Sequence, residues 1–203
     1  NIGTNSATFS PNFQFFINTF SSASQPTTYT LNEAKTGRQI QVIEDNKALS
    51  DKLKAYNLPT KEFFVLKTAK GNELNAWILK PKDFDPSKKY PVFMYQYSGP
   101  GSQQVNNDWN GTDDYWFLSL TQQGYIVACV DGRGTGFKGA DFKKVTQKEL
   151  GKYEVEDQID AAKVIGAYPY VDASRIGIFG WSYGGFMASN CMFQGADVFK
   201  TAI

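Results

Sequence analysis

The sequence predicts an α/β fold: an open, mostly parallel sheet with helices on its faces, preceded by a short all-β segment. Three observations predict it. Four short strand-like runs occupy roughly the first 45 of the 203 residues. Continuous apolar runs then alternate with amphipathic runs, as in sheets whose parallel strands are covered on both faces. Near residue 182 a glycine-flanked serine separates a strand-like run from a helix-like run.

The first 45 residues are rich in Phe, Thr, Tyr, Ile and Val, and turn signals such as Pro11-Asn12, Pro26 and Gly37 divide them. This pattern predicts strands at 7–10, 13–21, 27–31 and 39–43. Four short strands at about ten-residue spacing match one blade of a β-propeller, here its last part. A blade implies neighbouring blades. The alternative is an antiparallel meander packed on the next domain.

A helical linker is predicted over residues 46–60. Leu49 and Leu53 lie four apart with charged residues between them, which indicates a short amphipathic helix over 46–56, and Pro59 ends it. The chain therefore divides into an all-β segment (1–45), a linker (46–60) and an α/β part (61–203).

The α/β part begins with a predicted hairpin, whose strands are 62–68 and 74–79. Further strands are expected at 91–97, 125–130, 175–179 and 199–203, and helices at 115–122, 155–167 and 186–192. In the second of these helices, Asp157 is expected on the polar, solvent-facing side. Ligands of open α/β sheets bind beyond the carboxyl ends of the strands, where Tyr97, Asp131 and Ser182 fall.

The pentapeptide Gly180-Trp181-Ser182-Tyr183-Gly184 is a G-x-S-x-G motif. A strand-like run precedes it and a helix-capable run follows, which is the context of a nucleophile elbow. The turn must be tight, so its flanking positions need glycine. We therefore expect Ser182 to be a nucleophile. The backbone N–H of Tyr183 would be one donor to the oxyanion.

A second oxyanion donor is expected from the loop 97–101, which lacks the His-Gly-Gly-Gly run of lipases. Tyr97 can supply its phenolic O–H, and the alternative is a packing tyrosine. The chain contains no histidine. That removes the usual general base for a nucleophilic serine and most zinc sites. We expect neither a metal nor a cofactor.

Three other motifs have plainer explanations. The glycines of 134–139 spell G-x-G-x-x-G, but three residues separate them from the preceding strand, unlike a dinucleotide fingerprint. Glu154 and Glu156 could be a glycosidase pair, yet acidic residues near a helix start favour the macrodipole. The sequon 110–112 is best taken as a chance match. Asp131 and Arg133 are expected to form an ion pair that braces the glycine-rich loop.

The composition limits the kinds of partner that the chain is expected to bind. The formal net charge is +1 with both signs interleaved, so no nucleic-acid or membrane-surface partner is indicated. No apolar run reaches the ~20 residues of a membrane span. The chain opens at Asn1 without Met, so the lack of a visible leader decides little. Cys129 and Cys191 lie in apolar runs and are expected to be buried free thiols rather than a disulfide.

Four blocks of sequence resemble the dipeptidyl peptidase IV branch of the prolyl oligopeptidase family. They are YQYSGP (95–100), DGRG (131–134), LGKYEVEDQI (150–159) and GWSYGG (180–185), in the same order and at similar spacing. The resemblance covers nearly the whole chain. It implies an α/β-hydrolase domain, incomplete here, that follows the last segment of a β-propeller.

The resemblance further implies a serine peptidase that releases N-terminal dipeptides after Pro or Ala. Ser182 would be the nucleophile, Tyr97 and the Tyr183 amide would hold the oxyanion, and Tyr183 and Trp181 would contact the peptide substrate. It also implies a homodimer in the full-length protein and a periplasmic, membrane-anchored or secreted location.

The family's catalytic Asp and His follow the elbow, beyond Ile203, and its acidic residues for the substrate amine lie in earlier propeller segments. We therefore expect the 203 residues alone to be inactive. The alternatives are an acylaminoacyl peptidase, another prolyl oligopeptidase relative, or a non-catalytic interaction homologue. A binding module would need neither Ser182 nor Tyr97.

Overall fold

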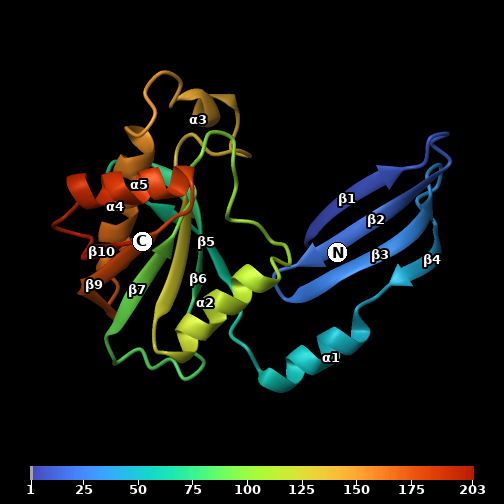
Figure 1. Ribbon diagram of the computed structural model, residues 1–203, viewed down its shortest axis with the longest axis horizontal. Helices are drawn as coiled ribbons and strands as arrows, with labels where there is room; N and C mark the ends of the chain where they lie inside the picture. Colours follow the sequence, from blue (N-terminus) through green and yellow to red (C-terminus); the bar gives the residue numbers. More distant parts are fainter. Residues whose placement is uncertain (1) are drawn as a thin grey trace. The chain divides into compact units, whose positions relative to one another are not determined.

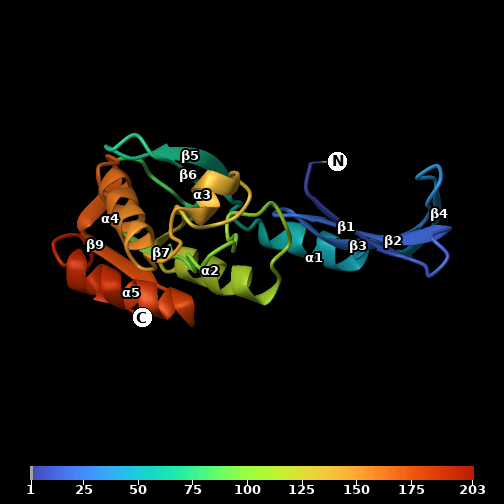
Figure 2. The same cartoon turned by 90° about the horizontal axis from the view of Figure 1, so that it is seen from above.

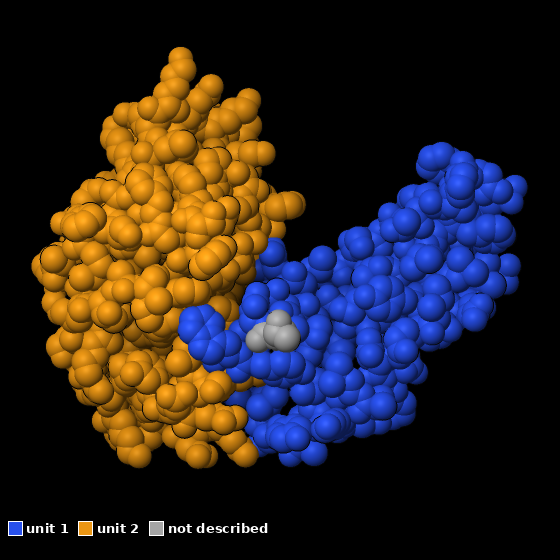
Figure 3. All heavy atoms as spheres, viewed as in Figure 1, with its two compact units in different colours: residues 1–60, 106–116 blue, residues 61–105, 117–203 orange. Residues whose placement is uncertain are grey.

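A computed structural model describes residues 2–203 and divides the chain into two compact units (Figure 3). The first unit runs to Thr60 and also includes Asn106–Trp116. The second contains Lys61–Val105 and Phe117–Ile203. Within residues 2–203, no helix has the length and apolar character needed to cross a membrane.

The first unit contains a four-stranded antiparallel sheet in which each strand pairs with the next along the chain. Figure 2 views this sheet nearly edge-on. Its strands are β1 (Thr4–Phe9), β2 (Phe15–Ser22), β3 (Gln25–Glu33) and β4 (Gln39–Glu44). The four predicted strands are confirmed, with ends that differ by up to three residues. Every residue of β1 and β4 is exposed in this chain.

The predicted linker helix is α1 (Lys47–Tyr56), which ends at Asn57 in a left-handed conformation. None of its residues is buried. Asn106–Trp116 joins the same unit through hydrogen bonds: the Trp109 N–H donates to Ser21 Oγ (3.1 Å), and Asn107 Oδ1 accepts from the Ala23 N–H (3.0 Å). The sequence alone predicts no more for this segment than a polar loop of the α/β part.

The second unit contains a six-stranded sheet in the order β10-β9-β7-β8-β6-β5 (Figure 1). Its strands are β5 (Glu62–Lys67), β6 (Glu73–Leu79), β7 (Tyr90–Tyr95), β8 (Ile126–Asp131), β9 (Val171–Phe179) and β10 (Thr201–Ala202). β5 with β6 and β6 with β8 are antiparallel, whereas the other neighbours are parallel. The predicted antiparallel start and parallel continuation are confirmed.

Alternating side chains of the strands build two hydrophobic cores. On one face, residues such as Met94, Ala128 and Ile178 pack with α4 (Tyr153–Gly166) and α5 (Tyr183–Gln194). On the other face, residues such as Trp77 and Phe93 pack against Phe117 of α2 (Thr112–Gln122). Both faces are therefore covered, and this explains the continuous apolar runs. A short helix, α3 (Ala140–Lys144), was not predicted.

The sequence assigned Asp157 of α4 to the solvent, and this is wrong. The residue is fully buried. Its carboxylate accepts hydrogen bonds from Nε, Nη2 and the backbone N–H of Arg133 and from the Asn72 side-chain amide. Arg133, from another loop, therefore compensates its charge. Cys129 and Cys191 are free and buried, as expected.

Candidate active site

Ser182 stands at the turn between β9 and α5, where the chain leaves the carboxyl end of its strand. Its backbone adopts φ 56° and ψ −116°, a conformation that a non-glycine residue occupies only when its surroundings impose it. The residue is exposed, and no partner among residues 2–203 hydrogen-bonds its hydroxyl. This is the geometry of a nucleophile elbow.

Backbone packing explains the glycines around Ser182. A Cβ on Gly184 would lie 2.7 Å from the Gln96 carbonyl oxygen, and a Cβ on Gly180 would overlap the Gly184 backbone. At Gly185 the nearest atom, the Gly180 carbonyl oxygen, would be 3.2 Å away. The requirement for a residue without a Cβ is therefore strict at Gly180 and Gly184 and milder at Gly185.

Gln96 fastens this turn to the end of β7. It is fully buried. Its backbone N–H donates to Phe179 O (3.0 Å), and its side-chain amide donates to Gly184 O (2.7 Å). The sequence placed Gln96 inside a matching block but assigned it no role, because nothing local distinguishes it from any other polar residue at a strand end.

Tyr97 follows directly and lies beside the elbow. Its ring centroid is 6.2 Å from that of Tyr183. Gly99 leaves room for the ring, since a Cβ there would overlap the Tyr97 side chain. Among the described residues none hydrogen-bonds the Tyr97 hydroxyl, so this group is available to a ligand. Ser98 next to it has φ 60° and is buried, and its hydroxyl accepts from Gln158 Nε2 (3.3 Å).

The loop after Tyr97 is held by the loop after β8. The Gly101 N–H donates to Gly134 O, and the Gly136 N–H donates to Ser102 O, both at 2.8 Å. Asp131 accepts from the backbone N–H groups of Gln104 and Val105, at distances down to 2.8 Å. Burial raises the pKa of Asp131 to about 6, although these two N–H donors act in the opposite direction.

The expected ion pair between Asp131 and Arg133 is wrong. Arg133 pairs instead with Asp157 and Glu156 of α4, each at 2.7 Å, and its guanidinium lies 4.8 Å from the Tyr153 ring centroid. These partners, Asp157 first, raise the pKa of Arg133 further above its usual range. Arg133 and Asp131 still brace the loop, but each does so through a different segment of the chain.

The G-x-G-x-x-G run at 134–139 belongs to this bracing loop. Gly134 and Gly139 have positive φ, and only the five-residue α3 follows. The run therefore does not open a long helix, as a dinucleotide site would require. Within the described part of the chain, no group of His, Cys, Asp or Glu could hold a metal ion.

Glu154 has a specific role that the helix macrodipole does not explain. It is fully buried, and its Oε1 accepts a hydrogen bond from the Tyr183 hydroxyl (2.8 Å). Burial, followed by this contact and the charge of Glu154, raises the pKa of Tyr183 well above its usual range. Glu154 therefore joins the start of α4 to the residue after Ser182, and Glu156, two residues later, faces Lys70 and Arg133.

Trp181 is 78% exposed, next to Ser182. The structure thus brings Ser182, Tyr183, Tyr97 and Trp181 to one edge of the sheet. Sequence reasoning missed the residues that hold them, Gln96 and Glu154. The only signal was their presence inside the blocks 95–100 and 150–159.

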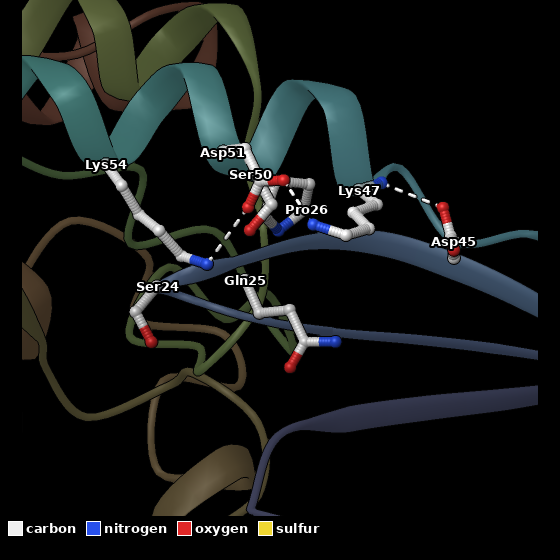
Figure 4. A pocket seen from close by; sticks show the side chains of 8 residues that line it. All are labelled: Ser24, Gln25, Pro26, Asp45, Lys47, Ser50, Asp51 and Lys54. Carbon is white, nitrogen blue, oxygen red and sulfur yellow. Dashed lines mark hydrogen bonds and ion pairs between the residues drawn. The ribbon is translucent and has the colours of Figure 1, made fainter.

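A separate hollow of about 390 Å³ lies in the first unit, between the start of β3 and α1 (Figure 4). Its charged groups are mutually compensated: Lys47 and Lys54 both pair with Asp51, and the Lys47 N–H donates to Asp45. It contains none of the residues with predicted chemistry.

Comparison with known proteins agrees with this fold. The model of the prolyl oligopeptidase family matches residues 112–203. The dipeptidyl peptidase 4 proteins of Trichophyton equinum and Trichophyton tonsurans are each 36% identical over 198 residues, which is 97% of this chain and 26% of theirs. The crystal structure of Porphyromonas gingivalis dipeptidyl peptidase 4 covers all of this chain with 50% identity and a TM-score of 0.95.

The chain belongs to the dipeptidyl peptidase IV branch of the prolyl oligopeptidase family. It spans about a quarter of the length of these relatives, 26% of the Trichophyton proteins and 28% of the Porphyromonas chain. Within the family, its four-stranded sheet corresponds to the end of the propeller, and its six-stranded sheet to part of the α/β-hydrolase domain.

Proposed function

We propose that this chain carries the nucleophile half of the active site of a serine peptidase that releases dipeptides from peptide N-termini, after Pro or Ala. One observation carries the proposal: Ser182 is held exposed and in a strained conformation at the end of β9, and the next residue, Tyr183, has its ring centroid 6.2 Å from that of Tyr97. Strain of this kind persists where the surrounding structure imposes it, and it concentrates at functional sites.

The chemistry is acyl transfer. Ser182 Oγ bonds to the carbonyl carbon of the second substrate residue, the peptide C–N bond breaks, and the serine proton reaches the departing amine through a base. Water then hydrolyses the ester and restores Ser182. In the tetrahedral intermediates, the Tyr97 hydroxyl and the Tyr183 N–H donate to the oxyanion. As the first residue of α5, Tyr183 has an N–H with no acceptor inside the helix.

The proton acceptor comes from outside these residues, because the 203 residues contain no histidine. The family resemblance supports an Asp and a His that follow the elbow in a longer chain. We therefore expect the 203 residues alone to be inactive, since removal of a triad member leaves only residual catalysis. Measurable turnover of a glycyl-prolyl reporter by this chain would contradict that.

Substrate preference rests on the aromatic residues around the nucleophile. The Tyr183 ring, packed between Tyr97 and Phe186, would contact the proline or alanine side chain. The exposed Trp181 would contact the peptide next to the scissile bond. The relatives named dipeptidyl peptidase 4 support dipeptide release over removal of acylated residues.

Active-site labelling tests the proposal on the full-length protein that contains this chain. A fluorophosphonate should label one serine, and Ser182→Ala should abolish the label. Ser189→Ala is the matched control, because this exposed α5 serine only donates to Gly185 O (2.9 Å). Labelling that survives Ser182→Ala would place the nucleophile elsewhere. A preference for an N-acylated reporter over glycyl-prolyl would instead support an acylaminoacyl peptidase.

A further inference from the structure

Glu154 reaches the active site from a different helix, and its side chain accepts a hydrogen bond from the Tyr183 hydroxyl there. We propose that Glu154 is a positioning residue for proline specificity, which fixes the Tyr183 ring through the tyrosine hydroxyl. The inference rests on the proposed function, because it assigns a cause to the substrate preference of the same site.

The geometry of the contact is directional. The Tyr183 hydroxyl donates to Glu154 Oε1 at 2.8 Å, while Glu154 Oε2 accepts from the Gly151 N–H at 3.0 Å. Both carboxylate oxygens therefore have a donor, and the carboxylate cannot rotate without losing one of them. Hydrogen bonds to ionised acceptors are about twice as strong as neutral ones, so this is an effective anchor.

The fold supplies the conditions that keep a buried carboxylate there. Glu154 is the second residue of α4, where the helix N-terminus favours negative charge. Gly151, which gives the second donor, has φ 86°, and a Cβ there would lie 3.3 Å from the Phe186 ring of α5. The loop before α4 thus packs directly on α5. A solvated surface acid would need none of these arrangements.

Tyr183 is consequently fixed at three points. Its backbone begins α5 directly after Ser182. Its ring packs against Tyr97 (6.2 Å) and edge-on against Phe186 (5.7 Å between centroids). Its hydroxyl is held by Glu154. Without the last contact, the ring could rotate about χ1 and χ2, while its backbone N–H would stay in the first turn of α5.

This separation predicts a selective defect. The oxyanion donor is a backbone group, so loss of the Glu154 contact should leave kcat largely intact. The Tyr183 ring, which contacts the substrate proline, would lose its fixed orientation. KM for a glycyl-prolyl reporter should therefore rise, and the preference for proline over alanine should fall, because alanine offers less surface to the ring.

The test uses the full-length protein with Glu154→Gln, Tyr183→Phe and the double variant. Tyr183→Phe keeps the ring and removes only the hydroxyl. We expect each single variant to raise KM for the glycyl-prolyl reporter roughly tenfold, with kcat within about twofold, and to lower the proline-to-alanine ratio of kcat/KM. The double variant should be no worse than Tyr183→Phe, since both changes break one interaction.

Glu149→Gln is the matched control. Glu149 lies five positions earlier, is exposed and pairs with Lys152 at 2.7 Å. The KM and the proline-to-alanine selectivity of the Glu149→Gln variant should therefore stay at the wild-type values. If Glu154→Gln does not fold, Tyr183→Phe alone must show the same selectivity loss. Additive effects in the double variant, or an unchanged proline-to-alanine ratio in Tyr183→Phe, would overturn the inference. Failure of the proposed function itself appears separately, as fluorophosphonate labelling that Ser182→Ala does not remove.

Discussion

The side-chain amide of Gln96 donates a 2.7 Å hydrogen bond to the carbonyl oxygen of Gly184, 88 residues away in the sequence. This bond joins the strand that ends beside Tyr97 to the helix that starts after Ser182. Gln96 is fully buried, so water cannot replace the bond. The proposed nucleophile and the proposed oxyanion donor are therefore parts of one packed assembly.

Replacing Gln96 by Met should weaken that assembly. Met conserves the shape of the side chain but cannot donate, so the variant should lose about 1 kcal/mol of unfolding free energy. It should also slow fluorophosphonate labelling of Ser182 several-fold. Gln123→Met, at an exposed position, is the control. A labelling rate equal to that of the wild type would show that the bond does not position the elbow.

Alanine substitutions at the elbow glycines should have graded effects. Gly184→Ala places a Cβ 2.7 Å from a backbone oxygen, whereas Gly185→Ala places one at 3.2 Å. We expect Gly184→Ala to abolish labelling or folding and Gly185→Ala to cost about 1 kcal/mol, within the range of a typical point mutation. Thermal unfolding and labelling of both variants check this. The reverse order would contradict the packing described for Gln96.

Tyr97→Phe should slow acylation with little effect on stability. The hydroxyl has no hydrogen-bond partner in the described part of the chain, so its loss leaves no buried group unsatisfied. Loss of one oxyanion donor typically lowers kcat about 10²–10³-fold. Turnover of a glycyl-prolyl reporter by the full-length variant measures this, with Tyr125→Phe as the control at another tyrosine. Unchanged turnover would make Tyr97 a packing residue.

Asp131 should make stability depend on pH. Burial raises its folded-state pKa to about 6, from 3.8. Between these pH values the folded state holds a proton on Asp131 that the unfolded state has lost. The contribution of Asp131 to the free energy of unfolding is therefore largest at low pH and is lost as the pH rises through about 6. By linkage the change is on the order of 3 kcal/mol.

Asp131→Asn removes this titration. The unfolding free energy of the wild type, measured relative to Asp131→Asn, should fall between about pH 4 and pH 7. A constant difference across that range would show that Asp131 titrates near its ordinary pKa. Because Asp131 binds the N–H groups of Gln104 and Val105, the same experiment also reports on the loop that follows Tyr97.

Much of the fold followed from local pattern. The alternation of apolar runs and helices predicted the parallel sheet, and the turn signals of the first 45 residues predicted four antiparallel strands. The G-x-S-x-G pentapeptide predicted the elbow because its glycines are a local steric requirement. Strand and helix ends were less accurate, and α3 was missed, because five residues carry little periodic signal.

The sequence by itself determined the order of the elements, the position of Ser182 and the absence of a histidine base. Only the tertiary structure decided which partners hold the site. The sequence predicted an ion pair between Arg133 and Asp131, two residues away, but Arg133 binds Asp157, 24 residues away. Glu154 likewise binds Tyr183, which lies 29 residues further along the chain. Spacing along a chain constrains contacts within one helix or strand. Contacts between elements depend on which opposite charges and hydrogen-bond partners lie close to a buried charge once the helices pack. No local sequence pattern predicts those partners.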